Sequence, residues 1–250
     1  MSGMIRPRLI SITCLAVAAF IISACHGPNR VADSDASGTT FDCDKTFAQV
    51  DALCHAKEYA EAEGVLREAI ASIPASDSRA DRIAAAVCRR RLAQVLAADR
   101  RFADAEVEAE IAYEALHELY QPIEEYPTGD EQVARAAWTL GEIRLLSGRP
   151  AEAEELLLEA SIWFEGLDSA SADTAVLLGV IGECLAQQGK YSDAEDTTVQ
   201  SYVRLLKLKG EKAPETLDAL QRVLFLYQAW DRPDKVDEYL AASGLTDSSR

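Results

Sequence analysis

The pentapeptide YAEAE at residues 59–63 recurs along this chain in related forms. Its fourth residue, which we call the marker, is small or β-branched in every copy, and successive markers are 43, 48, 41 and 42 residues apart. Spacing this regular indicates a stacked array of structural repeats. The other copies are FADAE at 102–106, PAEAE at 150–154, YSDAE at 191–195 and a weaker PDKVD at 233–237, which give the markers Ala62, Ala105, Ala153, Ala194 and Val236.

Further positions keep the same register relative to the marker. The residue twelve before it is Val50, Ala93, Gly141, Gly182 or Leu224, and seven after the first four markers stand Ala69, Ala112, Ala160 and Ser201. Small side chains let two helices cross closely, because a larger side chain would push the helix axes apart. The pattern therefore predicts helical hairpins that pack through Ala62, Ala105, Gly141, Ala153, Gly182 and Ala194.

Helix-start signals place the two helices of each hairpin. An aromatic residue or a proline opens each pentapeptide, and proline suits the first turn of a helix, where its missing N–H is not needed. Acids follow in that turn, where they favour the helix dipole. We expect first helices near 43–57, 80–99, 131–147, 171–188 and 213–230, and second helices near 60–73, 102–120, 150–166, 191–209 and 233–243.

This pattern resembles the tetratricopeptide repeat. The similarity covers about residues 43 to 243, and Leu140-Gly141, Gly148, Ala153 and Ala160 carry it best. The usual period is 34 residues, and a period near 42 resembles the longer repeats of kinesin light chains and many bacterial proteins. The resemblance implies an all-α, right-handed superhelical solenoid of about five antiparallel helix pairs. An unrelated helical bundle is the alternative, and it would require five registers to coincide by chance.

The amino end has the pattern of an export signal. Arg6 and Arg8 precede an apolar run at 9–22, which ends in Ile22-Ser23-Ala24-Cys25. A basic start, a short apolar core and small residues form a secretory leader, and this ending resembles the bacterial lipoprotein lipobox. By that resemblance, residues 1–24 are removed and Cys25 carries covalent lipid. The alternatives are an uncleaved membrane helix, which usually needs about 20 apolar residues, and a secretory leader without lipid.

The segments that flank the repeats are polar. Residues 25–42 are poor in apolar side chains and are interpreted as a tether between lipid and domain, and 244–250 as a polar tail. His26, in place of the Asp that retains lipoproteins in the inner membrane of well-studied bacteria, favours the outer membrane. The predicted location is therefore the cell envelope, on a membrane surface facing the periplasm.

The charge of the chain bears on its partners. The net charge is −17, and a chain that begins at Cys25 loses Arg6 and Arg8 and reaches −19. Phosphate backbones need clustered lysine and arginine, so nucleic acid is not an expected partner.

Residue patterns of catalysis and of metal binding are not found. His26, His55 and His117 share no register, and the sequence has no nucleophile elbow, phosphate loop or HExxH motif. We therefore expect neither an enzyme, nor a metal site, nor a cofactor other than the lipid on Cys25.

An exported compartment permits disulfides. Cys43 and Cys88 occupy successive first helices, which run roughly parallel in this family, and form a candidate disulfide. Cys184 is expected to be a buried small side chain.

The resemblance also implies a concave groove lined by first helices, which usually holds a peptide. Its arginines either clamp the carboxylates of a partner or pair with neighbouring acids of the chain. By register, the groove residues are Phe47, Asp51, Arg90, Arg91, Gln94, Arg135, Trp138, Glu142, Glu183, Arg222 and Phe225.

These observations favour a lipid-anchored, non-enzymatic scaffold that binds an envelope protein or peptide in the groove. The alternative is a homo-oligomeric adaptor. In that case the last repeat, which no further helix covers, meets another copy through Leu224, Tyr227, Tyr239 and Leu240.

Overall fold

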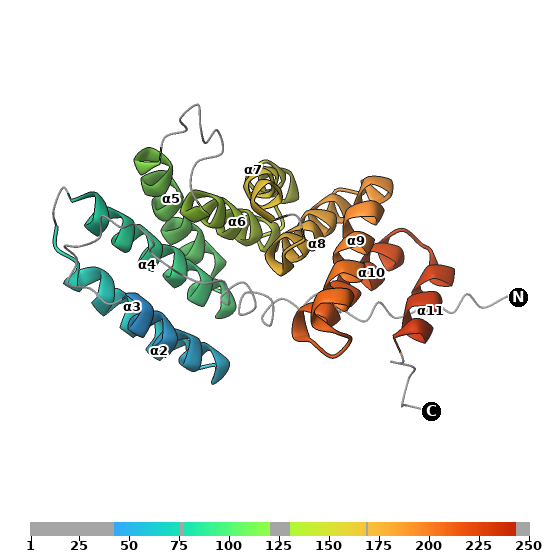
Figure 1. Ribbon diagram of the computed structural model, residues 1–250, viewed down its shortest axis with the longest axis horizontal. Helices are drawn as coiled ribbons and strands as arrows, with labels where there is room; N and C mark the ends of the chain where they lie inside the picture. Colours follow the sequence, from blue (N-terminus) through green and yellow to red (C-terminus); the bar gives the residue numbers. More distant parts are fainter. Residues whose placement is uncertain (1–42, 76–77, 121–130, 169, 244–250) are drawn as a thin grey trace, which may run out of the picture.

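The computed structural model describes residues 43–75, 78–120, 131–168 and 170–243, which hold ten α-helices and no strands (Figure 1). The predicted leader, Cys25 and the two polar flanking segments lie outside these ranges. The helices are α2 (Cys43–His55), α3 (Tyr59–Ser72), α4 (Arg79–Ala98), α5 (Phe102–Leu119), α6 (Glu131–Leu146), α7 (Pro150–Asp168), α8 (Ala172–Gln187), α9 (Tyr191–Lys209), α10 (Pro214–Ala229) and α11 (Pro233–Ala242).

The helices form five antiparallel hairpins in chain order, as the sequence predicts, and every predicted boundary is correct to within two residues. The turn inside each hairpin has a residue with positive φ five positions before the marker. Gly148 and Gly189 occupy it in the third and fourth repeats, whereas Lys57, Arg100 and Asp231 adopt φ values of 57–64° in the others. A side chain in this left-handed region costs roughly 1 kcal/mol, so three of the turns are held by the packing around them.

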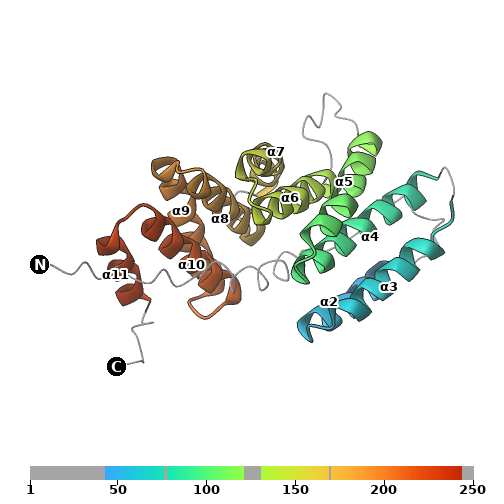
Figure 2. The ribbon, with the colours of Figure 1, turned by 180° about the vertical axis from the view of Figure 1, so that it is seen from behind.

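The hairpins follow one another along an arch (Figures 1 and 2). Successive first helices, such as α6 with α8 and α8 with α10, contact one another, whereas successive second helices have no comparable contacts. In a curved stack, the closer elements lie on the inside of the curve. The first helices therefore form the inner face, with α7 outside α6 and α8 in Figure 1.

Small residues bring the helices of a hairpin into close contact. The four alanine markers are fully buried, at 0% exposure. A Cβ added at Gly182 would lie 2.1 Å from Thr198 Oγ1 and 3.0 Å from the Thr198 backbone nitrogen, and one at Gly141 would lie 2.9 Å from Leu157 Cγ. In these two hairpins the second helix thus lies so close to the first that a Cβ at the glycine would require its neighbours to shift.

Ion pairs join successive repeats on the outer side in a constant register. The acid that follows one marker binds the base four residues before the next marker: Glu63 with Arg101 at 2.5 Å, Glu106 with Arg149, and Glu154 with Lys190 at 2.8 Å. The hydrogen bond from Arg149 lowers the pKa of Glu106, and that from Lys190 lowers the pKa of Glu154. These acids therefore do more than favour a helix dipole, because each aligns its repeat with the next one.

We predict that Gly182→Ala destabilises the protein by about 1–3 kcal/mol, because the new Cβ overlaps the buried Thr198. Gly64→Ala is the matched control: it changes a helical glycine with no atom within 4 Å of the added Cβ, and it is expected to stabilise by roughly 1 kcal/mol through helix propensity. Denaturant unfolding followed by circular dichroism measures both. Equal effects of the two substitutions would contradict the close approach.

Candidate functional site

A ladder of polar contacts runs along the inner face. Its members stand eleven and fourteen residues before the marker of each repeat, and we call it the inner ladder. Hydrogen bonds join the first of these positions in one repeat to the second in the next repeat in three cases: Asp51 with Arg91, Gln94 with Thr139, and Glu183 with Arg222. Glu142 and Val180 occupy the corresponding positions of the third and fourth repeats.

The first three repeats form a continuous part of the ladder. Arg91 Nη2 donates to Asp51, and Arg91 Nη1 donates to Gln94 Oε1 at 3.1 Å. Gln94 Nε2 in turn donates to Thr139 Oγ1 at 3.4 Å. Arg91 is 1% exposed and its guanidinium lies over the Phe47 ring, 5.5 Å from the centroid. This arginine connects two repeats and is not available to a partner.

The other arginines of the predicted groove are held in the same way. Arg135 donates to Glu131 at 2.7 Å and to Asp173 of the next first helix at 3.0 Å. Arg222 Nε donates to Glu183 at 3.0 Å. Of the two interpretations of the arginines, pairing with acids of the chain is therefore the one that the contacts support, because guanidinium groups within the stack bind the nearest carboxylates.

Most of the predicted groove residues are buried instead of lining an open surface. They lie between neighbouring first helices, where side chains of adjacent repeats meet. Phe47, Arg90, Arg91, Gln94, Arg135, Trp138, Glu142 and Arg222 are buried, whereas Asp51, Glu183 and Phe225 are half-buried.

Trp138 differs most from its expected role as an apolar pocket of the groove. It is 4% exposed and packs edge-on against Phe164 of α7, with ring centroids 5.5 Å apart. It belongs to the core of its hairpin, because the position fifteen residues before the marker lies between the two helices. Phe225 is the aromatic residue of the predicted set that keeps an exposed part.

Glu142 is the exception in the inner ladder. It is buried, and the corresponding position of the next repeat holds the apolar Val180. Burial raises the pKa of Glu142 to about 7, against the lowering effect of Arg222 and of the Trp138 indole, and Glu183 raises it further. The Trp138 Nε1 atom is buried and has no hydrogen-bond partner within the described residues. A buried carboxylate whose pKa is raised in this way marks a functional candidate.

Asp218 is a member of this region that the sequence analysis did not identify. It lies one turn before Arg222 in α10 and is buried, and its Oδ2 has no hydrogen-bond partner within the described residues. Burial raises its pKa to about 6, while Arg222 lowers it. The repeat register, which puts Asp218 in the same position as Arg135, was the signal that would have found it.

Cys43 and Cys88 are brought together, although their pairing stays a prediction. The pKa of Cys88 is raised, first by a hydrogen bond with the Cys43 side chain and then by burial. Cys184 is buried and its thiol donates to the Pro150 carbonyl oxygen at 2.9 Å. Burial raises the pKa of Cys184 to about 11, so at neutral pH this thiol stays protonated and has little nucleophilic character.

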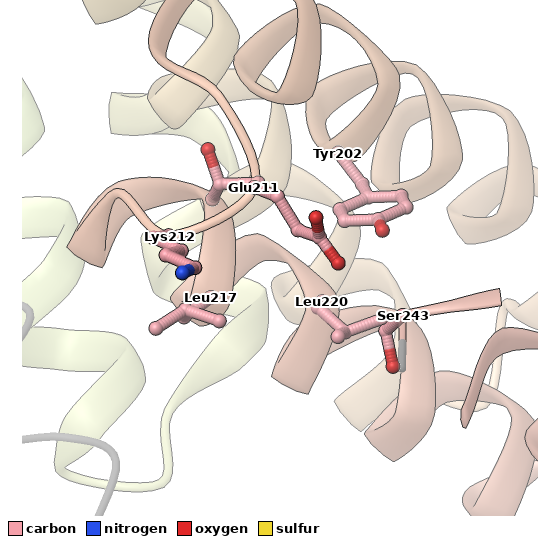
Figure 3. Close-up of a pocket in the computed structure, with 7 residues that line it drawn as sticks. Tyr202, Glu211, Lys212, Leu217, Leu220 and Ser243 are labelled. Carbon is pink, nitrogen blue, oxygen red and sulfur yellow. The ribbon is translucent and has the colours of Figure 1, made fainter. Parts of the chain in front are cut away.

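A pocket of about 350 Å³ opens at the C-terminal edge of the stack. Figure 3 shows Glu211 reaching toward the space between Tyr202 and Leu220, with Lys212 near Leu217. Nearby, the predicted contact residue Tyr227 is buried, because its ring stacks on Tyr239 with centroids 5.7 Å apart. The edge that the sequence leaves uncovered is thus partly closed by its own aromatic residues.

Few candidate metal sites, membrane-spanning helices or histidine clusters are found in the part of the chain that the structure describes. There, no three histidine, cysteine or acidic side chains are grouped to hold a metal ion. No described helix is long and apolar enough to cross a membrane. His55 bonds the Asp51 carbonyl oxygen at 2.7 Å, whereas His117 lies against Tyr113 in a different hairpin, so the two imidazoles do not converge.

We predict that Glu142→Gln stabilises the protein increasingly as pH rises. The folded-state pKa of Glu142, near 7, lies above its usual value of 4.5. The folded wild type therefore loses stability as pH rises from about 4.5 through 7, because Glu142 must then ionise while it is buried. The advantage of the variant should grow by roughly 2 kcal/mol between pH 5 and pH 8, as measured by urea unfolding. The exposed Glu155→Gln of α7 should follow the wild type, and a pH-independent difference for Glu142→Gln would contradict the burial.

Comparisons with known proteins agree with this architecture. A family model described as a tetratricopeptide repeat matches residues 132–202, which run from α6 into α9. The crystal structure of BtubC (BKLC) from P. vanneervenii is 18% identical, with a TM-score of 0.64 over 80% of this chain and 78% of that chain. A putative kinesin light chain of Podospora anserina, with nearly identical TPR-like repeats, is 17% identical, with a TM-score of 0.62 over 80% of this chain and 92% of that one.

No curated protein matches the sequence significantly. At these identities, the two solved structures establish the fold alone. The family match and the fold agree with the repeat pattern of the sequence. Residues 132–202 are therefore tetratricopeptide repeats, and the described chain has the fold of a tetratricopeptide-like helical solenoid.

Proposed function

We propose that this protein is a lipid-anchored, non-enzymatic scaffold of the bacterial cell envelope that binds a partner polypeptide along its inner face. The observation that carries the proposal is the tetratricopeptide match on a stack whose first helices form one inner surface. A fold of this kind supports protein–protein interaction, because each repeat contacts mainly its neighbours and leaves a long surface for a partner.

The leader and Cys25 support the membrane part of the proposal. Two or three acyl chains on one residue give stable attachment, since each buried CH₂ contributes about 0.8 kcal/mol. The polar segment 25–42 then gives the repeats distance from the lipid. His26 favours the outer membrane, with the repeats facing the periplasm.

The residues that meet the partner are those of the inner face that keep exposed area. Arg91, Arg135 and Arg222 are engaged within the stack. Glu183 and Phe225 are half-buried, and Gln187, one turn after Glu183, is exposed. We therefore assign first contact with the partner to the region where α8 and α10 lie side by side, and we give the arginines a role in holding the shape of the surface.

The second candidate function is a homo-oligomeric adaptor, which the apolar C-terminal edge favours. Leu217 lines the pocket there and is 36% exposed, and Leu206 of α9 is 37% exposed. An edge of this kind offers contact area to a second copy. The two functions predict different crosslinked products.

We predict that a photo-crosslinking amino acid at Gln187 or Phe225 captures a partner in cells, because both positions lie on the accessible part of the inner face. The same amino acid at Ile162, which is 60% exposed on α7, is the matched outer-face control. Gel analysis of the membrane fraction should show an adduct for the two inner positions alone. An adduct from Ile162 alone would place the partner on the outer face, and an adduct with the mass of two copies would favour the adaptor.

We predict two covalent features in protein extracted from membranes. Acyl chains on Cys25 increase the intact mass, and a Cys43–Cys88 disulfide decreases it by two hydrogens. Intact mass spectrometry before and after reduction measures both. Cys25→Ala should remove the acyl mass and leave the leader uncut, and Cys88→Ser should remove the reducible difference. An unchanged mass for Cys25→Ala would exclude the lipid anchor.

A further inference from the structure

The pocket at the C-terminal edge of the stack is large enough to hold a ligand. Its volume is about 350 Å³, within the range of roughly 300–1,000 Å³ that ligand pockets occupy. Tyr202 of α9 and the α10 residues Leu217 and Leu220 form apolar walls, and Ser243, directly after α11, also lines it. Leu217 is 36% exposed. The pocket therefore leaves apolar area open to solvent.

Charges of both signs border this apolar space. Glu211 and Lys212 lie in the turn between α9 and α10, and both are exposed lining residues. Within the described residues Lys212 has no ion-pair partner, whereas its neighbour Lys209 pairs with Glu215 at 3.8 Å. An occupant that is apolar at one point and acidic a short distance further along would match both the walls and this lysine.

A segment with that composition begins at the border of the pocket. Residues 244–250, which lie outside the described ranges, follow Ser243 directly and have the sequence Gly-Leu-Thr-Asp-Ser-Ser-Arg. Leu245 is their one large apolar residue. Because a chain advances by at most about 3.6 Å per residue, the Cα atom of Leu245 lies within about 7 Å of that of Ser243, and that of Asp247 within about 14 Å. Both side chains are within reach of the pocket.

The order of residues in this segment matches the order of groups along the pocket. In an extended segment, alternate side chains point to the same side, so Leu245 and Asp247 share a side. In the view of Figure 3, Leu220 lies between Ser243 and Lys212. A segment that runs from Ser243 in that direction brings its leucine to the apolar walls and its acid toward the lysine.

We infer that residues 244–250 occupy this pocket, with Leu245 against Leu217 and Leu220 and with Asp247 near Lys212. Burial of the leucine removes its surface and that of the pocket walls from water. The covalent link keeps the segment at an effective concentration in about the millimolar range. A contact too weak to form between separate molecules therefore forms within the chain. The inference goes beyond the proposed function, because it requires no partner on the inner face.

An occupied pocket has two consequences for the last repeat. Helix α11 has no fully buried residue and packs on α10, so a segment held in the pocket secures the end of α11. The same segment covers Leu217, which the homo-oligomeric adaptor would offer to a second copy. The segment and a second copy therefore compete for one apolar surface.

The test measures hydrogen exchange of the α11 amides in the full chain in detergent, by mass spectrometry of its peptides. Leu245→Asp should release the segment and speed exchange in α11 about tenfold, because a short terminal helix opens locally when an apolar contact is lost. Ser249→Asp adds the same charge to the same segment and is the matched control, which should exchange as the wild type does. Equal exchange in Leu245→Asp and the wild type would overturn the inference.

A second variant separates the pocket from a local effect at the end of α11. Leu217→Asp changes a partly exposed side chain of the pocket wall and should also speed exchange in α11 about tenfold. If Leu245 and Leu217 touch, the double variant exchanges no faster than either single variant, because both remove one contact. Effects that multiply to about a hundredfold would be independent of each other and would also overturn the inference.

Dilution distinguishes the chain's own segment from that of a second copy. Protection of α11 in the wild type should be unchanged after dilution by about a hundredfold, because the contact lies within one chain. Protection that is lost on dilution would assign the pocket to a second copy and overturn the inference in favour of the adaptor. Crosslinking at Gln187 and Phe225 should persist in Leu245→Asp, so the inner face and the pocket are tested separately.

Discussion

The close approach of the two helices in each hairpin is the constraint on which the other features depend. At Gly182, a single added carbon atom would overlap Thr198, and at Gly141 it would press on Leu157. Glycine and alanine at these positions set the distance between helices, and that distance sets the offset from one repeat to the next. Because the offset is constant, side chains in the same register meet again at every interface, and contacts along the stack repeat with it.

Two sets of polar contacts follow from this regular offset, one on each side of the stack. On the outer side, acids next to the markers bind bases of the following turn, as Glu106 does with Arg149. On the inner side, the ladder from Asp51 to Thr139 joins three repeats. A chain with net charge −17 thus uses much of its positive charge between repeats. Exposed ion pairs contribute little to stability, but pairs held between helices fix which side chains face each other.

The same regularity makes an exception visible. Val180 occupies the register position that Arg91, Thr139 and Arg222 occupy in other repeats, and burial raises the pKa of Glu142 to about 7. Local departures from an otherwise consistent pattern occur mainly at functional sites, where stability is given up for another purpose. The part of the inner face near α6, α8 and α10 therefore combines exposed Gln187, half-buried Phe225 and an excess of acid.

The repeat spacing predicted stacked helical hairpins, and the resemblance to the tetratricopeptide repeat implied the solenoid. Together with the helix-start signals, the spacing placed the ten helices of the described residues to within two residues. It also located the inner face, from register and family resemblance. The sequence did not decide which polar residues are buried between repeats and which are exposed on the inner face. Arg91 and Trp138 were expected on an open groove and are buried, because burial depends on the separation of neighbouring first helices, which residues far apart in the chain set together. Only the tertiary structure shows that Arg91 bonds Asp51 of the preceding repeat, since the two residues meet through a contact between repeats that neither local sequence contains.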